Sequence, residues 1–384
     1  MADGSDTVLA RTVSSIRDIG RSAWDACANA DRTTYHPFAS YDFLCALEES
    51  GSVDPSTGWG VFHLVLKEGG RISGVAPLYL KSHSQGEYVF DHHWADAYMR
   101  AGGRYYPKLL SATPFTPVPG PRLLAAGAAQ KRALGAAFIE AAKKTAASSI
   151  HVNFLPEDED RILQDLGFLP RRGVQYHWFN RGYESFDDFL AALASRKRKA
   201  IRRERKTIAE SGLVIRHITG ADISEAHWDA FWTFYQDTGS RKWGRPYLTR
   251  RFFSLVGERM ADKILLIIAE RAGKPIAGAL NFIGGDALYG RYWGCREDYP
   301  FLHFELCYHQ AIDYAIAMKL ARVEAGAQGE HKIARGYEPV ETRSAHWIAD
   351  PGLRAAIARY LDAERTQNAE EIEMLGDFAP FRKE

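Results

Sequence analysis

Five ionisable residues stand in two short segments of the second half of the chain. His303 and Glu305 lie near the start of an apolar helical pattern, and Glu330, His331 and Lys332 follow a short apolar run. A carboxylate or an imidazole can take a proton from an attacking ammonium, while an ammonium or backbone N–H groups can stabilise a carbonyl oxyanion. We therefore interpret these five residues, the 303–332 cluster, as a candidate catalytic site for acyl transfer to an amine. The open alternative is that Glu305 only charges the first turn of a helix and that His331 is a loop residue.

Histidine and carboxylate side chains in these segments are also metal-ligand types. A His-x-Glu pair, however, does not share one face of a helix, because residues two apart point about 200° away from each other. No Cys-x-x-Cys spacing occurs among Cys27, Cys45, Cys295 and Cys307. We therefore expect no metal site and no disulfide framework.

A strongly basic run, RKRKAIRRERK, occupies residues 196–206. On a helix over 190–210, Leu190, Leu193, Ile201 and Ile208 would form a narrow apolar seam and leave most of the surface cationic. The simple interpretation is a solvated helix face. The functional interpretation is a surface for the phosphates of tRNA, of a nucleotide-linked precursor or of CoA. The candidate phosphate-binding residues are Arg196, Lys197, Arg198, Lys199, Arg202, Arg203, Arg205 and Lys206.

Aromatic and charged residues also gather in the first half of the chain. Residues 101–124 contain five prolines, which stiffen the backbone. Aromatic rings beside cations can bind a planar or phosphorylated ligand, or they can form a polar interface between two halves of the chain, and both interpretations stay open. The residues concerned are Asp91, His92, His93, Trp94, Asp96, Tyr98, Tyr105, Tyr106, Lys108 and Arg122.

The bulk composition is that of an ordinary globular protein. With 384 residues, 46% of them hydrophobic and 25% charged, the chain is long enough for two domains. The net charge of +1 provides no global attraction to nucleic acid or membrane, so any such attraction must come from a local patch. The N-terminal sequence lacks a signal-peptide pattern, and no apolar run approaches the roughly 18 residues of a membrane span. We expect a cytoplasmic protein that does not insert into a membrane.

Two hairpin-like segments repeat along the chain. VFHLVLKEGGRISGVAPLYL from Val61 and LLIIAERAGKPIAGALNFIG from Leu265 both indicate strand, glycine turn and strand, and an offset of 204 matches Gly69 to Gly273. We expect a third strand after each hairpin, at 88–94 and 288–293, then a helix and a late strand. Such a half-chain repeat is the sequence sign of a duplicated domain.

The second half gives the clearer pattern of elements. Helices are expected at 228–236 and 247–260, followed by strands at 264–269, 276–283 and 288–293. A long helix with apolar residues near the helical period is expected at 304–320, with a strand at 322–326 and a final helix over 353–374.

Several motifs run through both halves. They are Trp94-Ala95-Asp96-Ala97-Tyr98, Tyr105-Tyr106-Pro107-Lys108-Leu109, Pro114-Phe115-Thr116-Pro117, Gly120-Pro121-Arg122, Trp293-Gly294, His303-Phe304-Glu305 and GAQGEHKIARGYEP from Gly326. With these motifs and this order of elements, the chain resembles the GNAT (N-acetyltransferase-like) fold in a doubled form. It is similar to the Fem family of peptidoglycan-bridge aminoacyltransferases, and more closely to a bacterial branch of N-acyltransferases described as peptidoglycan biosynthesis/recognition proteins.

The resemblance implies an α/β (α+β) protein of two tandem GNAT-like domains, with mixed, largely antiparallel sheets flanked by helices. We place an acceptor-side domain at 1–182 and a catalytic, donor-side domain at 183–384, entered by the basic helix at 190–210. The acceptor-binding residues that fall within the family's motifs are Asp96, Tyr98, Tyr106, Lys108, Arg122 and Trp293.

The donor is the main open question. A CoA-dependent GNAT protein carries an (Arg/Gln)-x-x-Gly-x-(Gly/Ala) loop that holds the pyrophosphate at a helix start. The near match here, Arg291-Tyr-Trp-Gly-Cys-Arg296, fails at Arg296, which blocks close backbone approach. We therefore expect aminoacyl-tRNA as the donor, a small-molecule or cell-wall-related amine as the acceptor, and no tightly bound cofactor. An acyl-CoA donor and a non-catalytic module that binds RNA or a glycan remain as alternatives.

Overall fold

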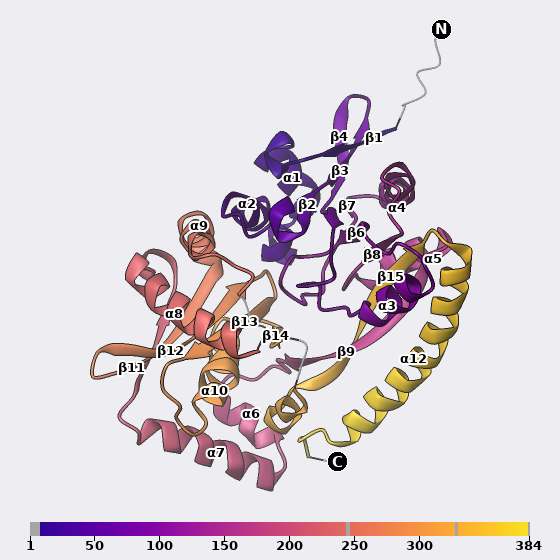
Figure 1. Cartoon of the computed structure of the whole chain (residues 1–384). Helices are drawn as coiled ribbons and strands as arrows, with labels where there is room; N and C mark the ends of the chain where they lie inside the picture. The colour runs from indigo at the N-terminus through magenta and orange to yellow at the C-terminus, as the bar shows by residue number, and fades with distance from the viewer. Residues whose placement is uncertain (1–7, 243–245, 327–328, 383–384) are drawn as a thin grey trace. The chain divides into compact units, whose positions relative to one another are not determined.

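The computed structural model describes residues 8–242, 246–326 and 329–382 (Figure 1). The chain folds into two compact units. The first comprises the chain up to Asp31, Phe38–Gly173 and Glu341–Ala369, and the second comprises Arg32–Pro37, Val174–Val340 and the chain from Glu370 onward. Each unit is thus assembled from separated stretches, while the single boundary after residue 182 stays a prediction. Within the described ranges, no helix has the length and apolar character that a membrane crossing needs.

The first unit contains a four-stranded antiparallel sheet. Its strand order is β1-β3-β4-β7, with the hairpin β3–β4 at its centre. Leu66 of β3 lies in one apolar core with Leu134 and Phe138 of helix α4, because those two residues are one helical turn apart on the face turned to the sheet. The elements are β1 (Leu9–Val13), β3 (His63–Glu68), β4 (Arg71–Ala76), β7 (Leu124–Ala125) and α4 (Ala128–Lys144).

A second group of strands in this unit runs in the order β15-β8-β6-β5-β2. β8 pairs antiparallel with β15, from Ser149 opposite Ile348 to Val152 opposite Ala345, and parallel with β6. The strands are β2 (Trp59–Val61), β5 (Tyr79–Lys81), β6 (Lys108–Ser111), β8 (Ser149–Val152) and β15 (Glu338–Ile348). The accompanying helices are α1 (Arg21–Ala28), α2 (Tyr41–Glu49), α3 (His92–Arg100) and α5 (Glu157–Asp165), and α12 (Pro351–Asp377) begins in this unit.

The second unit contains strands in the order β10-β11-β12-β13-β14-β9. β10 to β13 are antiparallel, β13 and β14 are parallel, and β14 is antiparallel to β9. The strands are β9 (Leu169–Phe179), β10 (Val214–Ile218), β11 (Ile264–Arg271), β12 (Lys274–Ile283), β13 (Ala287–Cys295) and β14 (Arg322–Glu324). Helices α6 (Phe186–Ala192), α7 (Ser195–Ala209), α8 (Glu225–Lys242) and α9 (Arg250–Met260) complete the unit with the helix described next. The expected meander and its two preceding helices are confirmed.

The helix after the meander is interrupted by a π turn. It consists of α10 (Leu302–Phe304), a π turn over Glu305–His309 and α11 (Gln310–Ala317), where a single helix over 304–320 was expected. Leu306, Ile312 and Ile316 on this helix pack into the core of the unit with β11. π turns are rare and occur often at functional sites, because they shift the side chains of one turn out of the α-helical register.

The two hairpins repeat with the same turn and the same bulge. Each has a two-residue turn with positive φ at both positions, Gly69-Gly70 in the first unit and Ala272-Gly273 in the second. Each has one extra residue in its second strand, Ser73 in β4 and Ile276 in β12. Turn and bulge both match at an offset of 203, because Gly70 and not Gly69 is equivalent to Gly273. The expected repeat is present, with its register corrected by one residue.

The expected third strand of the first half, at 88–94, is wrong. His92–Arg100 is instead helix α3, because Trp94 and Ala95 are buried on one side of a helix while their neighbours are exposed. The basic helix expected over 190–210 is likewise two helices, α6 and α7, since the backbone is extended at Leu193. Residues 77–123, which hold β5, α3 and β6, lengthen the link between β4 and β7. In the second unit, only Gly284–Asp286 join β12 to β13.

Candidate functional site

Helix α7 carries the basic run. Its buried residues, Ile201, Glu204 and Ile208, are three and four positions apart and therefore lie on one face. The exposed cationic residues are Arg196, Lys199, Arg202, Arg203 and Lys206, and Lys197, Arg198 and Arg205 are partly buried. The outer face of α7 therefore has the charge that a phosphate-binding surface needs.

Two adjacent residues of α7 contact the helix that carries Glu305. The Glu204 carboxylate accepts from Arg335 Nη2 at 2.7 Å and lies 3.1 Å from His309 Nε2. Arg205 Nη2 lies 3.3 Å from Glu305 Oε1 and 2.6 Å from an Asp313 carboxylate oxygen. The basic helix is thus attached to the expected catalytic segment by side chains of both signs.

Glu305 stands at the first position of the π turn and is only 3% exposed. Its Oε1 accepts a hydrogen bond from Gln310 Nε2 at 2.7 Å, in addition to the Arg205 contact. Its buried Oε2 has no hydrogen-bond partner among the residues that the structure describes. The carboxylate is thus oriented through one oxygen and keeps acceptor capacity on the other.

The expected residues His303 and His331 lie in one partly exposed aromatic group. The Tyr308 hydroxyl is hydrogen-bonded to His331 Nε2 at 2.9 Å, and the His303 and His331 rings are 6.1 Å apart. Trp293, expected on the acceptor side, lies 5.2 Å from His303, so it belongs to this group. Glu330, by contrast, is exposed at the start of the short 3-10 helix Glu330–Arg335.

Lys332 is the one buried ammonium of the 303–332 cluster, with 2% of its surface exposed. Its Nζ donates to the Gly326 carbonyl at 2.9 Å. Burial, assisted by the nearby Arg291 charge, lowers the pKa of Lys332 to about 7. Near neutral pH this group is therefore divided between a cation that can stabilise an oxyanion and a neutral amine.

A buried charged group beside β13 and β14 was not found from the sequence. Arg291 is the extra residue of a bulge in β13, and its Nη2 lies 3.3 Å from Glu324 at the end of β14. Arg322 Nε also contacts Glu324, at 3.0 Å, and His177 of β9 lies 4.0 Å from it. The segment that nearly matched a pyrophosphate loop is therefore strand and not a turn that opens a helix. Across 8–242, 246–326 and 329–382, no three His, Cys, Asp or Glu side chains are placed to hold a metal ion.

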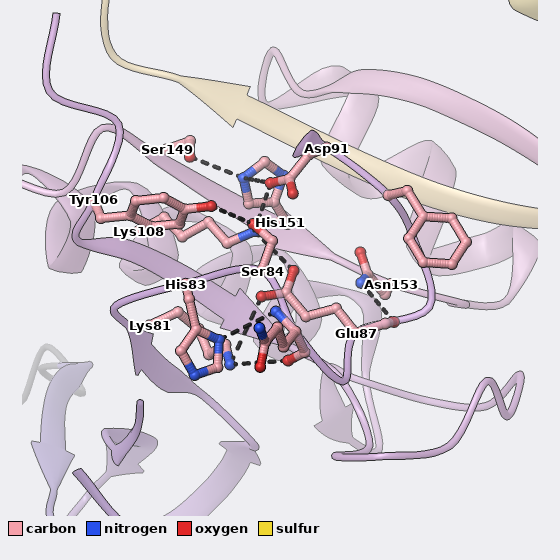
Figure 2. Close-up of polar contacts among 12 residues, drawn as sticks. Lys81, His83, Ser84, Glu87, Asp91, Tyr106, Lys108, Ser149, His151 and Asn153 are labelled. Atoms are coloured by element: carbon pink, nitrogen blue, oxygen red, sulfur yellow. Dashed lines mark hydrogen bonds and ion pairs between the residues drawn. The ribbon is translucent and has the colours of Figure 1, made fainter. Parts of the chain in front are cut away.

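The first unit has its own buried polar group, centred on Lys108 (Figure 2). Lys108 Nζ donates to Ser84 Oγ at 2.7 Å and to Glu87 Oε2 at 2.7 Å, and it also contacts Asp91. The Tyr106 hydroxyl shares a 2.8 Å hydrogen bond with Ser84 Oγ. The expected acceptor-side residues Tyr106 and Lys108 are thus brought together, through a serine that sequence reasoning did not single out.

Histidines extend this Lys108 network inward. His151 Nε2 lies 2.8 Å from Ser149 Oγ and 3.6 Å from Asp91, and His151 Nδ1 is 2.6 Å from His346 Nδ1. Since one of two facing Nδ1 atoms must donate, the two rings have different tautomers. Burial lowers the pKa of His151 to about 3 and that of His346 well below its ordinary value, so both rings are neutral.

The charge on Lys108 limits what the network can do. Burial alone would lower the pKa of Lys108, but the Glu87 and Asp91 carboxylates raise it above its ordinary value. Lys108 is therefore a permanent ammonium at neutral pH and cannot act as a base toward Ser84. Tyr106 is the partly exposed member of the network, so its hydroxyl is the group that a ligand could meet.

Among the described residues of the first unit, the other expected acceptor-side residues do not contact Lys108 directly. Arg122 is buried, and its guanidinium donates to the backbone carbonyls of Val118, Gly120, Pro121 and Asn153. Asp96 is exposed on α3, and Tyr98 of the same helix packs closely over Gly103. Within the first unit, the structure therefore joins Tyr106 with Lys108 through Ser84, and it packs Tyr98 and Tyr106 against one apolar cluster.

Comparisons with solved structures agree with a doubled GNAT fold. A crystal structure of FemX matches with a TM-score of 0.55 and 13% identity, covering 88% of this chain and 98% of that one. The structure of L-PGS from Bacillus licheniformis matches with a TM-score of 0.52 and 9% identity, covering 85% and 98%. A conserved protein of unknown function from Bacteroides thetaiotaomicron matches with a TM-score of 0.52 and 12% identity, covering 88% and 99%. At these identities the likeness establishes the fold alone.

The sequence itself is matched by one family description. No curated protein matches the chain in sequence. The model of the FemAB-like family, described as peptidoglycan biosynthesis/recognition, matches residues 15–383, which is nearly the whole chain. The chain therefore belongs to the FemAB-like family of peptidoglycan biosynthesis and recognition proteins.

Proposed function

We propose that the chain is an aminoacyltransferase that moves an aminoacyl group from an aminoacyl-tRNA to an amine of a small-molecule or cell-wall-related acceptor. The family and the GNAT fold support acyl transfer in general. One observation supports the RNA-borne donor: the helix with the cationic outer face also holds, through Glu204 and Arg205, the segments that carry Glu305 and His331. A phosphate-binding surface and a candidate reaction site thus share one rigid element.

The proposed chemistry is aminolysis of an ester. The acceptor ammonium loses a proton to His331, the exposed base of the cluster, whose Nε2 is hydrogen-bonded to Tyr308. The amine nitrogen then attacks the ester carbonyl, the new C–N bond forms, and the C–O bond to the tRNA ribose breaks. The nitrogen gives up its second proton and the ribose oxygen takes one up. Lys332, in its protonated form, stabilises the oxyanion, while Glu305, Glu330 and His303 attract and orient the ammonium.

The acyl-CoA alternative lacks support from the structure of its key segment. Residues 291–296 lie in and just after strand β13, where Arg291 is buried against Glu324. Backbone N–H groups of a strand are engaged in its ladder and do not converge on a pyrophosphate as those of a helix start do. The tRNA donor therefore stays the preferred one.

Chemical stability of the product distinguishes the alternatives. The purified chain is incubated with total tRNA charged with labelled amino acids and a panel of amine acceptors, then treated with mild alkali. An ester to tRNA is cleaved by alkali while an amide survives, so label in an alkali-stable product supports the proposal. Alkali-stable label from acyl-CoA alone would establish the CoA alternative. Binding of RNA or glycan without any transfer would establish the non-catalytic module.

A further inference from the structure

Glu204 is the one acidic residue within the basic run 196–206, and the structure places it on the inner face of α7. Five of the cationic residues in the run are exposed, whereas Glu204 is 8% exposed. A carboxylate loses hydration on burial, so its presence requires partners that compensate for this loss. The outer face of α7 therefore carries the cationic residues proposed to bind phosphate, and the inner face carries one acidic residue.

Arg335 and His309 supply the compensation. The Arg335 guanidinium meets Glu204 through two nitrogens, with Nη2 at 2.7 Å from Oε1 and Nε at 3.2 Å from Oε2. This two-point contact fixes the guanidinium plane as well as its position. His309, at the end of the π turn, approaches Glu204 Oε2 from another side at 3.1 Å. Although burial alone would raise it, these partners hold the pKa of Glu204 below its ordinary value, so the carboxylate is charged at neutral pH.

Two further contacts of Arg335 fall on the candidate site. Nη1 donates to the His331 carbonyl at 2.8 Å. The guanidinium carbon lies 3.4 Å from the centre of the Phe304 ring, which stands between His303 and Glu305 in the chain. Arg335 therefore connects the backbone of the 330–335 helix to α10, and its own orientation depends on Glu204.

We propose that Glu204 is a positioning residue that holds His331 and Lys332 in their reactive arrangement by orienting Arg335. This inference rests on the proposed function for its catalytic readout. Glu204 touches neither donor nor acceptor, so its loss should affect turnover and leave donor affinity unchanged. Displacement of a reacting group by about 1 Å can cost 10²-fold in rate.

Glu204→Ala is the test and Glu210→Ala is its matched control. Each variant removes one negative charge from α7 or its end, but Glu210 is exposed just after α7 and its carboxylate lies 3.6 Å from Lys206. The tRNA dissociation constant, the KM for each substrate, kcat and the thermal midpoint are measured for both. We expect kcat of Glu204→Ala to fall about 10- to 100-fold with a tRNA dissociation constant within about threefold of wild type. Glu210→Ala should have the same dissociation constant, KM, kcat and thermal midpoint as wild type.

Glu204→Gln separates positioning from general destabilisation. Its single amide oxygen can still accept from Arg335 Nε and His309, but the second contact with Arg335 and the charge are lost, so it should recover part of the lost kcat and fold even where Glu204→Ala does not. Equal kcat in wild type and Glu204→Ala would overturn the proposal. A loss of tRNA affinity in Glu204→Ala as large as its loss of kcat would also overturn it. The same holds if Glu204→Ala is unfolded and Glu204→Gln has the kcat of wild type.

A second readout keeps this inference separate from the proposed function. If the wild-type chain transfers nothing from any charged tRNA, the donor assignment fails, and hydrogen exchange then decides the positioning role. Backbone amides of 330–335 should exchange at least tenfold faster in Glu204→Ala than in Glu210→Ala. Equal exchange in the two variants would overturn the link between Glu204 and this segment.

Discussion

Lys81 Nζ and Glu87 Oε1 lie 3.8 Å apart in the first unit, and both side chains are almost fully buried. Burial acts on the two groups in opposite directions. It lowers the pKa of Lys81 to about 7, even though Glu87 opposes the shift, and it raises the pKa of Glu87 to about 7 against the pull of Lys108. Two groups that normally titrate at opposite ends of the pH scale thus change charge in the same range.

The pair should give the chain a stability minimum near pH 7. Glu87 binds its proton more tightly when folded, so its contribution is complete below pH 4.5 and is lost as pH rises to about 7. Lys81 releases its proton more readily when folded, so its contribution is complete above pH 10.5 and is lost as pH falls to about 7. The free energy of unfolding is measured in urea between pH 5 and 9. Below pH 7 its decrease with rising pH should be smaller in Glu87→Gln than in wild type, by up to about 1.4 kcal/mol per pH unit. Identical slopes in variant and wild type would contradict this.

Replacement of Lys108 should destabilise the first unit strongly. Lys108→Met leaves the Glu87 and Asp91 carboxylates buried without their main partner, a change that typically costs about 3–5 kcal/mol. Tyr106→Phe is the matched comparison, because it removes one partly exposed hydroxyl and should change the unfolding free energy by less than about 1 kcal/mol. If Tyr106 meets the acceptor, Tyr106→Phe should raise the acceptor KM while Lys108→Met mainly lowers the yield of folded protein.

Charge reversal on the outer face of α7 should weaken RNA binding. Arg202 and Arg203 are both exposed, so Arg202→Glu with Arg203→Glu alters the surface and leaves the Glu204 contacts in place. We expect roughly 100-fold weaker binding of tRNA and a salt dependence shallower by about two units of slope. Lys143→Glu with Lys144→Glu makes the same charge change on the exposed end of α4. A similar loss in this control would mean that net charge, and not α7, determines the affinity.

The pH profile of transfer should reveal the charge on Lys332. If the ammonium form stabilises the oxyanion, kcat falls as pH rises through about 7, where Lys332 loses its proton. Lys332→Arg keeps a cation at every accessible pH, so this falling limb should vanish. Lys332→Met should lower kcat by about 10²- to 10³-fold at pH values below 7, and by less at higher pH, where wild type has also lost the charge. A falling limb that persists in Lys332→Arg would assign it to another group.

Strong local patterns predicted much of the fold. The apolar strands and glycine turns located both hairpins, because a two-residue turn with positive φ leaves a recognisable glycine signal. The repeat is expected one residue out of register because an offset of 204 also aligns Ile72 with Ile276 and Gly74 with Gly278, while only the turn and the bulge of the structure show the offset of 203. A strand at 88–94 is expected from the apolar run Tyr88–Phe90, but these three residues lie in neither strand nor helix. Helix α3 begins only at His92, and Trp94 packs into an apolar cluster.

The candidate site was only partly predictable, since its contacts join distant positions. Glu204 could have been noticed, because it falls in step with Ile201 and Ile208 on the apolar seam. Its partner Arg335 lies 131 residues further along the chain, and nothing local signals the pairing. The burial of Lys108 was equally hidden, because its neutralising carboxylates come from the loop at 87–91 and not from its own strand.

The pairing of β8 with β15 has a consequence for synthesis on the ribosome. Ser149–Val152 can pair with Ala345–Ile348 only after almost the whole second unit has been translated. At 5–20 residues per second, this interval lasts roughly 10–40 s. During that time β8 can have its neighbour β6 but not β15, so one row of its backbone N–H and C=O groups is unsatisfied. The unit whose synthesis begins first therefore stays incomplete until most of the second unit has been made, and its open strand edge is what a chaperone or an aggregating nascent chain would meet.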